Sequence, residues 1–395
     1  MHINEEKLTL PGVLFIMLVA GITLTHIFFQ IAALFLLFYW FVEFRAGNSF
    51  HLSLLEKFIF LFFISGLIAL FLTENPLGNL PHLMPHIILL SAIPLNWRFS
   101  REGFPQHRLW QIILFFTSLA ALGGIYYHFQ GEPRTHGFNG GYFTLASVMV
   151  FSIPIVLGES MRHPSSVTRN TVFLLALLHL LALWWTFTRS AFLGFFLGMG
   201  IWIVRDFKES LKTRHLTFGG DFTARLIFIL ILLTFIFTAK DPRINPLATS
   251  GNTAQQNQPV DITSGRASIY QDALHFLAED LKNGNWVNLL LGHGLNSRNR
   301  MVQSPFTSWE SDYLQAMMNQ GVGGVILVIG IYLLFLKQAL HALFSRSIRL
   351  QATGTAAIGY WAMSFFTLKL TGFTDAALFA LLVVLMNQLS PSSSD

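Results

Sequence analysis

The stretch TSWESDYLQAMMNQGVGGVILVIGIYLLFL, residues 307–336, decides the fold class, because a polar segment passes there directly into a long apolar run. The run from residue 313 to 336 carries no charged side chain and is long enough to cross a bilayer as one helix. Gly321, Gly323 and Gly324 are expected to loosen or kink this helix where it enters the membrane.

Composition indicates that this span is one of many. Hydrophobic residues make up 53% of the 395 residues and charged residues 11%, with a mean hydropathy of +0.55. So apolar a chain does not form a soluble domain. We expect an all-α polytopic membrane protein of about twelve transmembrane helices. The spans are expected at residues 11–24, 27–43, 58–73, 84–97, 110–128, 141–157, 172–188, 190–205, 225–239, 313–336, 352–370 and 374–389.

The charges predict an orientation. The N-terminal segment MHINEEKLTLPG is a poor signal peptide, so we expect it to be retained and cytoplasmic. Most Lys and Arg residues then fall on cytoplasmic segments, as the positive-inside rule requires. Residues 1–239 would hold nine spans, residues 240–309 a periplasmic loop, residues 310–389 three more spans, and residues 390–395 a cytoplasmic tail. Both termini are therefore expected in the cytoplasm.

The absence of cysteine limits the possible chemistry. It excludes disulfides, thiol nucleophiles and cysteine-based metal sites, so the long loop must be held by helices and packing alone.

The loop itself has internal order. Its first part, residues 241–261, is polar and irregular. From Ser264 apolar residues recur at helical spacing, which predicts an amphipathic helix that ends near Gly284 and carries Arg266 in its first turn. Thr263 or Ser264 is available as its N-cap. A compact turn at 290–296 then precedes a second helix, expected to begin near Ser308.

Three further polar points are expected on the same side. Arg134 and His136 lie in a glycine-rich segment between the fifth and sixth spans. Arg189 stands at the end of the seventh span, where a charge is costly unless it faces a wet cavity, an anion or the lipid headgroups. Lys369 and Asp375 bracket the last outer turn, where they can pair with each other.

The order of four motifs resembles a known family. TFTRSAFLGFFLG (186–198) is followed by SGRASIYQDAL (264–274), LLGHGLN (290–296) and ESDYLQAMMNQGVGG (310–324). Over roughly residues 130–336 this order is similar to the O-antigen ligase and polymerase superfamily of bacterial envelope glycosyltransferases. The resemblance implies a GT-C-like fold in the bacterial inner membrane and an inverting, metal-independent glycosyl transfer without a cofactor. On matching positions, Arg189 and Arg266 would hold the diphosphate of the substrate.

The resemblance also implies the partners. They would be undecaprenyl-diphosphate-linked glycan donor and acceptor on the periplasmic face, with membrane lipids around them and no nucleic acid. A chain-length regulator is the protein partner to look for.

One position departs from the ligase pattern. Ligases of this superfamily carry a histidine about eleven residues before the glycine that starts the next span, and counting back from Gly321 gives Glu310. This favours the polymerase, which joins the growing chain to a new lipid-linked repeat. A ligase that transfers the glycan to lipid A core or another acceptor is the close alternative. A membrane transporter or glycolipid flippase is an alternative of another class, against which no repeated halves are evident.

The chemistry of the residues agrees with such a transfer. Guanidinium groups are always charged and bind phosphate oxygens in a fork, so Arg189 and Arg266 suit a diphosphate leaving group. An attacking sugar hydroxyl needs a base, for which Glu310 is the first candidate and Asp312 or His293 the others. Alternatively, Glu310 could only cap the helix that follows it, and His293 could only support its turn.

Arg134, His136, His293, Asp312 and Tyr313 complete the predicted set as substrate-binding residues. The predicted catalytic residues are Glu310, Arg266 and Arg189, and no metal ligands are predicted.

Overall fold

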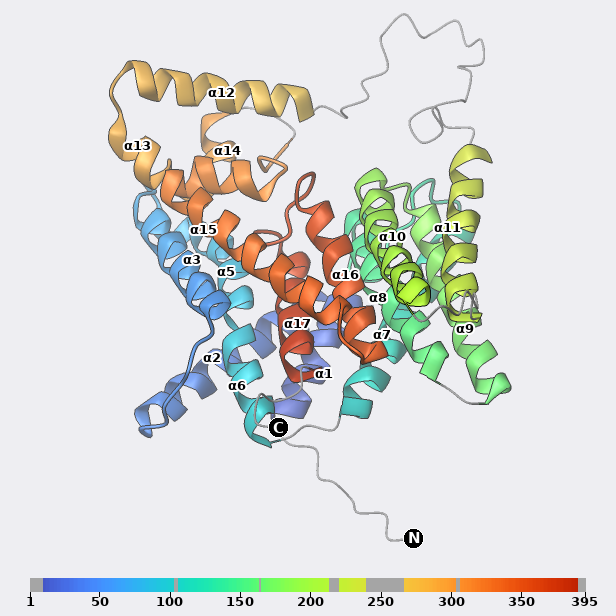
Figure 1. The fold of residues 1–395 in the computed structure, drawn as a ribbon. Helices are drawn as coiled ribbons and strands as arrows, with labels where there is room; N and C mark the ends of the chain where they lie inside the picture. Colours follow the sequence, from blue (N-terminus) through green and yellow to red (C-terminus); the bar gives the residue numbers. More distant parts are fainter. Residues whose placement is uncertain are drawn as a thin grey trace, which may run out of the picture.

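The computed structural model describes residues 10–102, 106–162, 165–212, 220–238, 266–302 and 306–389. All regular structure in these ranges is helical (Figure 1). Seven helices of this described part are long and apolar enough to cross a membrane, so the chain is a helical membrane protein. They are α2 (His26–Arg45), α3 (Leu54–Phe71), α7 (Gln106–Phe129), α8 (Tyr142–Arg162), α9 (Ser166–Trp185), α10 (Arg189–Lys212) and α15 (Asp312–Leu343).

The other expected spans coincide with helices outside this set of seven. These are α1 (Leu10–Thr23), α5 (Met84–Leu90) with α6 (Ala92–Glu102), α11 (Gly220–Thr238), α16 (Ile348–Met363) and α17 (Phe373–Leu389), while α4 (Pro76–Asn79) and η1 (Leu80–Leu83) precede α5. A helix of 14 residues such as α1 is about 21 Å long, which is less than the bilayer core. The helices therefore lie where hydropathy predicted them, whereas the number of twelve spans stays a prediction.

The core is built on helices that approach one another closely. Every residue of α8 from Leu145 to Ser160 is buried. On the neighbouring pair α10 and α16, a side chain at Gly194 or Gly198 would lie 2.4 Å from the carbonyl oxygen of Gly359 or 2.6 Å from that of Thr355. Small residues at such contacts let membrane helices pack backbone to backbone.

Basic side chains gather at one end of the bundle, called here the inner end. Glu159 of α8 pairs with Arg162 at 3.1 Å and with Arg349 of α16 at 3.2 Å. Arg205 of α10 pairs with Asp206 at 2.8 Å. These residues lie in the segments that the charge pattern predicts to be cytoplasmic.

The opposite, outer end carries α12 (Arg266–Lys282), α13 (Trp286–Leu291) and α14 (Ser297–Met301), which lie across the ends of α3 and α15 (Figure 1). The predicted amphipathic helix is confirmed as α12, which packs its buried Ile269 and Ala273 against Trp309 and Met318. The residues proposed as its N-cap lie outside the described part of the chain.

The second predicted helix begins later than expected. Its first residue is Asp312 instead of Ser308, because Ser311 is the N-cap and its hydroxyl accepts the backbone N–H of Leu314 at 3.3 Å. This cap also corrects the alternative reading of Glu310, which precedes the N-cap and does not cap the helix.

The predicted kink in α15 is confirmed at Gly321, where φ is 67° and ψ is −162°. The break releases carbonyl groups from the helical ladder. Those of Met318 and Asn319 accept instead the backbone N–H groups of His293, at 2.8 Å, and Gly294, at 3.1 Å. The turn 290–296 is therefore docked on the kink by backbone hydrogen bonds.

Candidate active site at the outer end

A pocket of about 480 Å³ lies at the outer end, between the start of α2, the start of α8 and the turn between α16 and α17. Most of its lining residues have polar side chains that can bind a hydroxyl-rich ligand. They include His26, Gln30, Asn139, Glu310, Lys369 and Asp375, with the ring of Phe143 among them.

Asn139 fixes the walls of this pocket. Its amide nitrogen donates to the carbonyl oxygen of Gly21, at 3.0 Å, and to the hydroxyl of Thr374, at 3.2 Å. These bonds join the outer end of α1 to the start of α17 through the segment before α8.

Glu310 enters the pocket from a strained turn. The backbone N–H of Ser311 donates to the carbonyl oxygen of Trp309 at 2.9 Å, which closes a three-residue γ-turn around Glu310 with φ of 61°. A γ-turn with positive φ is rare and strained, and a non-glycine residue there costs roughly 1–2 kcal/mol. Such strain persists only where the surroundings impose it, and it is concentrated at functional sites.

Trp309 is the surrounding group that imposes this strain. Its ring is fully buried, its Nε1 donates to the hydroxyl of Ser297 at 2.9 Å, and the guanidinium of Arg298 lies 4.6 Å from the ring centroid. With Trp309 on one side and the N-cap Ser311 on the other, the side chain of Glu310 is left facing the pocket.

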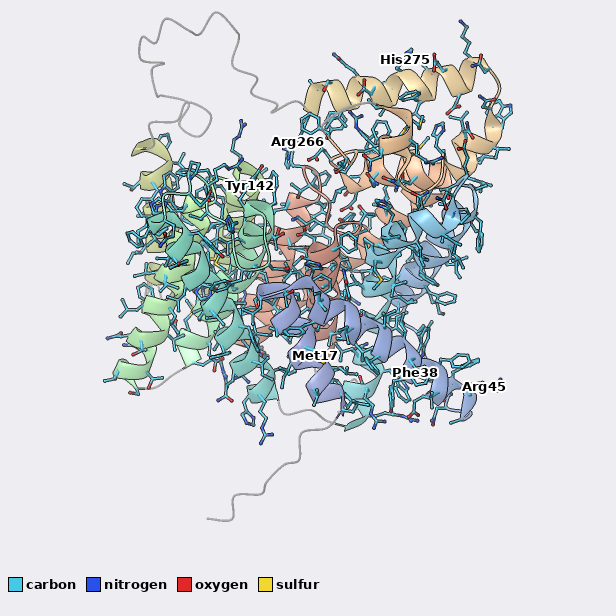
Figure 2. The ribbon with its side chains drawn as sticks, turned by 180° about the vertical axis from the view of Figure 1, so that it is seen from behind. Met17, Phe38, Arg45, Tyr142, Arg266 and His275 are labelled. Atoms are coloured by element: carbon cyan, nitrogen blue, oxygen red, sulfur yellow. The ribbon has the colours of Figure 1, made fainter. Side chains whose placement is uncertain are left out.

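Arg266 and Glu310, predicted from the sequence as site residues, are in contact. The Nη2 atom of Arg266 lies 3.6 Å from Oε2 of Glu310, and both side chains are about one quarter exposed (24% and 25%). The other carboxylate oxygen accepts the hydroxyl of Ser308 at 3.0 Å. Arg266 is the first residue of α12 and Tyr142 is the first residue of α8. Figure 2 shows both at the outer end of the bundle.

Arg134 carries a second guanidinium close to the rings of Tyr142 and Phe143. It lies 3.4 Å from the ring centroid of Tyr142 and 5.9 Å from that of Phe143, while Arg266 lies 5.8 Å from Phe143. The Nε atom of Arg134 donates to the backbone carbonyl of Thr186 and its Nη2 atom to that of Phe187, each at 3.2 Å. The structure therefore places two positive groups around one phenylalanine of the pocket.

Arg189 lies close to the turn that Arg134 holds. It is exposed, is the first residue of α10, and follows Phe187 by two positions. Arg134, for which the sequence predicted only a substrate contact, is the arginine that lies near Phe143 together with Arg266, and the joint role of Arg189 and Arg266 stays a prediction. His136 packs its ring on Tyr127, with centroids 4.1 Å apart.

Asp312 is fully engaged in holding the outer turn. Its carboxylate accepts the hydroxyl of Tyr332 at 2.5 Å, the backbone N–H groups of Lys369, at 2.6 Å, and Leu370, at 3.1 Å, and both N–H and hydroxyl of Thr371, at 3.1 and 2.9 Å. A carboxylate has about four lone-pair positions, so this set leaves none for a substrate proton. Glu310 is therefore the better candidate for the base.

Tyr313 belongs to an aromatic cluster beside that turn. Its ring centroid lies 5.5 Å from that of Phe365 and 5.6 Å from that of Tyr332.

His293 contacts other residues of the loop, in agreement with the alternative prediction that it supports its turn. Its Nε2 lies 2.8 Å from Oδ2 of Asp280, a distance typical of an ion pair, although the angles are not those of a hydrogen bond. The other oxygen of Asp280 accepts the side-chain amides of Asn285, at 3.3 Å, and Asn288, at 3.1 Å. His293 therefore ties α12 to the turn 290–296, and its contact with a substrate stays a prediction.

Lys369 and Asp375 are the site residues that sequence reasoning placed only in an outer turn. They pair at 2.7 Å, as expected, but they also line the pocket beside Glu310. The ammonium of Lys369, 1% exposed, also donates to the hydroxyl of Ser147 at 2.6 Å, and the hydroxyl of Tyr360 donates to Asp375 at 3.0 Å. The signal was the presence of two charges in a short turn between apolar spans.

Comparison with models of known protein families found no match, and comparison with curated proteins found none either. Within the described ranges, no group of three or more His, Asp or Glu side chains is arranged to hold a metal ion.

Proposed function

We propose that the chain is a glycosyltransferase of the bacterial inner membrane that polymerises undecaprenyl-diphosphate-linked oligosaccharide repeats. The outer end of the bundle would face the periplasm, and the proposal includes a GT-C-like arrangement of twelve spans with both termini in the cytoplasm. The observation that carries it is the carboxylate of Glu310, a residue with a strained backbone, in a pocket with many polar side chains, with Arg266 at 3.6 Å and both Arg266 and Arg134 near the ring of Phe143.

The pocket suits a sugar. Amide, hydroxyl and carboxyl groups, which are the groups that hydrogen-bond sugar hydroxyls, line it at Gln30, Asn139, Thr144 and Asp375, while Phe143 offers an apolar face. Arg134 and Arg266 both lie near Phe143. A lipid diphosphate would bind there, with its sugar toward the turn between α16 and α17, which forms the floor of the pocket.

The loose ion pair gives the reaction an order. At 3.6 Å, Arg266 and Glu310 attract each other without a proper hydrogen bond. A diphosphate carries more charge than a carboxylate and binds guanidinium in a fork, so it would displace Glu310 from Arg266. The donor substrate thereby releases the base that the reaction needs.

The transfer is then a single displacement. The acceptor hydroxyl attacks the anomeric carbon and gives its proton to Glu310, and the bond from that carbon to the diphosphate breaks with inversion. Arg266 and Arg134, with Arg189 nearby, stabilise the charge that grows on the leaving diphosphate.

The test uses purified protein in lipid nanodiscs with lipid-diphosphate-linked repeats as the only substrate. A ladder of longer glycans supports the polymerase. Glu310→Gln should abolish the ladder, whereas Glu279→Gln, which changes an acid that is 53% exposed on α12, should leave it intact. A full ladder from E310Q would remove Glu310 from the mechanism.

The same assay separates the alternatives. Absence of a ladder, together with transfer once lipid A core is added, would indicate the ligase. Movement of the lipid-linked glycan across the bilayer without a covalent product would indicate a flippase or transporter.

A further inference from the structure

Large apolar side chains cover the outer surface of α13 and the end of α12. Leu281, Trp286, Val287 and Leu290 are 60%, 61%, 62% and 57% exposed. A contiguous exposed apolar surface of this kind marks a contact with a protein or a membrane.

The position of α13 favours the membrane. The helix packs against α15 and the outer end of α3, at the edge of the bundle (Figure 1). Around that end, Phe71 of α3 and Leu77 of α4 are 71% and 85% exposed, so further large apolar side chains lie uncovered beside α13.

We propose that α13 and the last turn of α12 lie in the outer leaflet as an interfacial anchor, with Trp286, Val287 and Leu290 among the upper parts of the acyl chains. With six residues α13 is too short to span, so it lies flat in the interface. Tryptophan favours that depth, and the exposed Lys282 beside it can reach the lipid phosphates.

This anchor sets the position of Arg266. Asp280, through its contacts with Asn285, Asn288 and His293, joins the end of α12 to α13 and to the turn 290–296. From there α12 extends back over the bundle for 17 residues, or about 25 Å, to Arg266. The leaflet therefore holds the guanidinium at a fixed height, which under the proposed function is the height of a lipid diphosphate.

The chain contains no cysteine, so single cysteines can be labelled without background. Leu290→Cys and Val287→Cys would carry a nitroxide spin label in nanodiscs, and collision with dissolved oxygen would be compared with collision with a water-soluble nickel chelate. Two reference sites are available: Phe38→Cys on the span α2, 65% exposed, and Glu279→Cys on the polar side of α12, 53% exposed.

Labels at 287 and 290 should resemble the label at 38, with an oxygen-to-nickel accessibility ratio severalfold above that at 279. Equal ratios at 290 and 279 would show that α13 stands in water and would overturn the proposal. Low accessibility to both reagents would show that a protein or a second copy covers α13, which overturns it as well.

These measurements are independent of the enzymatic assignment. If the wild-type protein makes no glycan, the labels still decide whether the anchor exists. If it does make a ladder, Val287→Lys should shorten that ladder, while its lipid control Phe38→Cys should not.

Discussion

Alanine at Gly292 or Gly321 should destabilise the protein more than alanine at Gly323, an exposed glycine of α15. Gly292 has φ of 81° and ψ of 179°, and Gly321 has φ of 67° and ψ of −162°. Only glycine adopts this region readily, and another residue there costs roughly 1–3 kcal/mol. The two glycines also allow α13 and the kink of α15 to touch backbone to backbone.

The magnitude follows from the contacts that a methyl group would make. A Cβ atom at Gly292 would lie 2.3 Å from the backbone nitrogen of Gln320, and one at Gly321 would lie 2.4 Å from the carbonyl carbon of Leu290. Overlap with fixed backbone adds about 1–3 kcal/mol. The two terms sum to roughly 2–6 kcal/mol for each substitution.

The assay is thermal unfolding in detergent, with hydrogen exchange of residues 290–296 as a local readout. At roughly 2 °C per kcal/mol for a chain of this size, G292A and G321A should melt roughly 4–12 °C below the wild type. Gly323→Ala is the matched control, because its Cβ would lie 3.6 Å from the nearest atom, the carbonyl oxygen of Leu290. It should melt at the wild-type temperature or slightly above. If G292A and G323A melt together, the close docking of the turn on the kink is wrong.

Three further predictions test the outer site. Asp312→Asn should cost about 2–4 kcal/mol, because its new N–H donors face N–H donors; an unchanged melting temperature would show that the Asp312 carboxylate does not hold residues 369–371 in place. Lys369→Met should cost about 3–5 kcal/mol by leaving the largely buried Asp375 without its charged partner, and adding Asp375→Asn should restore most of it in a double-mutant cycle; an additive cycle would argue against the pair. Glu310→Gly should be more stable than Glu310→Ala by about 1 kcal/mol of relieved strain, although both should lack the proposed transfer activity; equal stability would argue against a strained turn at Glu310.

The helices were predictable because lipid offers no hydrogen-bond partner to the backbone, whose N–H and C=O groups must therefore bond to each other. Apolar runs therefore became helices at the expected places, and the spacing that predicted α12 held because Ile269 and Ala273 face the core. The kink at Gly321 was also predictable, since glycine at the entrance of a span weakens the helix there.

The details of the site were less accessible from the sequence. The start of α15 was placed too early because Ser308 and Ser311 are both suitable caps, and burial of Trp309 decides between them. The contact of Arg266 with Glu310 was not itself predicted, and the neighbourhood of Glu310 and Lys369 joins parts of the chain with no shared local pattern. Such contacts are products of tertiary packing, on which spacing along the chain has no bearing.

The clip formed by Asp312 has a consequence for biosynthesis. It binds residues 369–371, which leave the ribosome almost sixty residues after it. A nascent chain that has already inserted α15 thus carries a buried carboxylate whose one partner in that helix is Tyr332, until the turn between α16 and α17 supplies the others. That turn also brings the floor of the pocket. Arrested or truncated chains would hold every arginine of the site and lack the residues of that turn, so the proposed activity would require a molecule whose translation has passed its last turn.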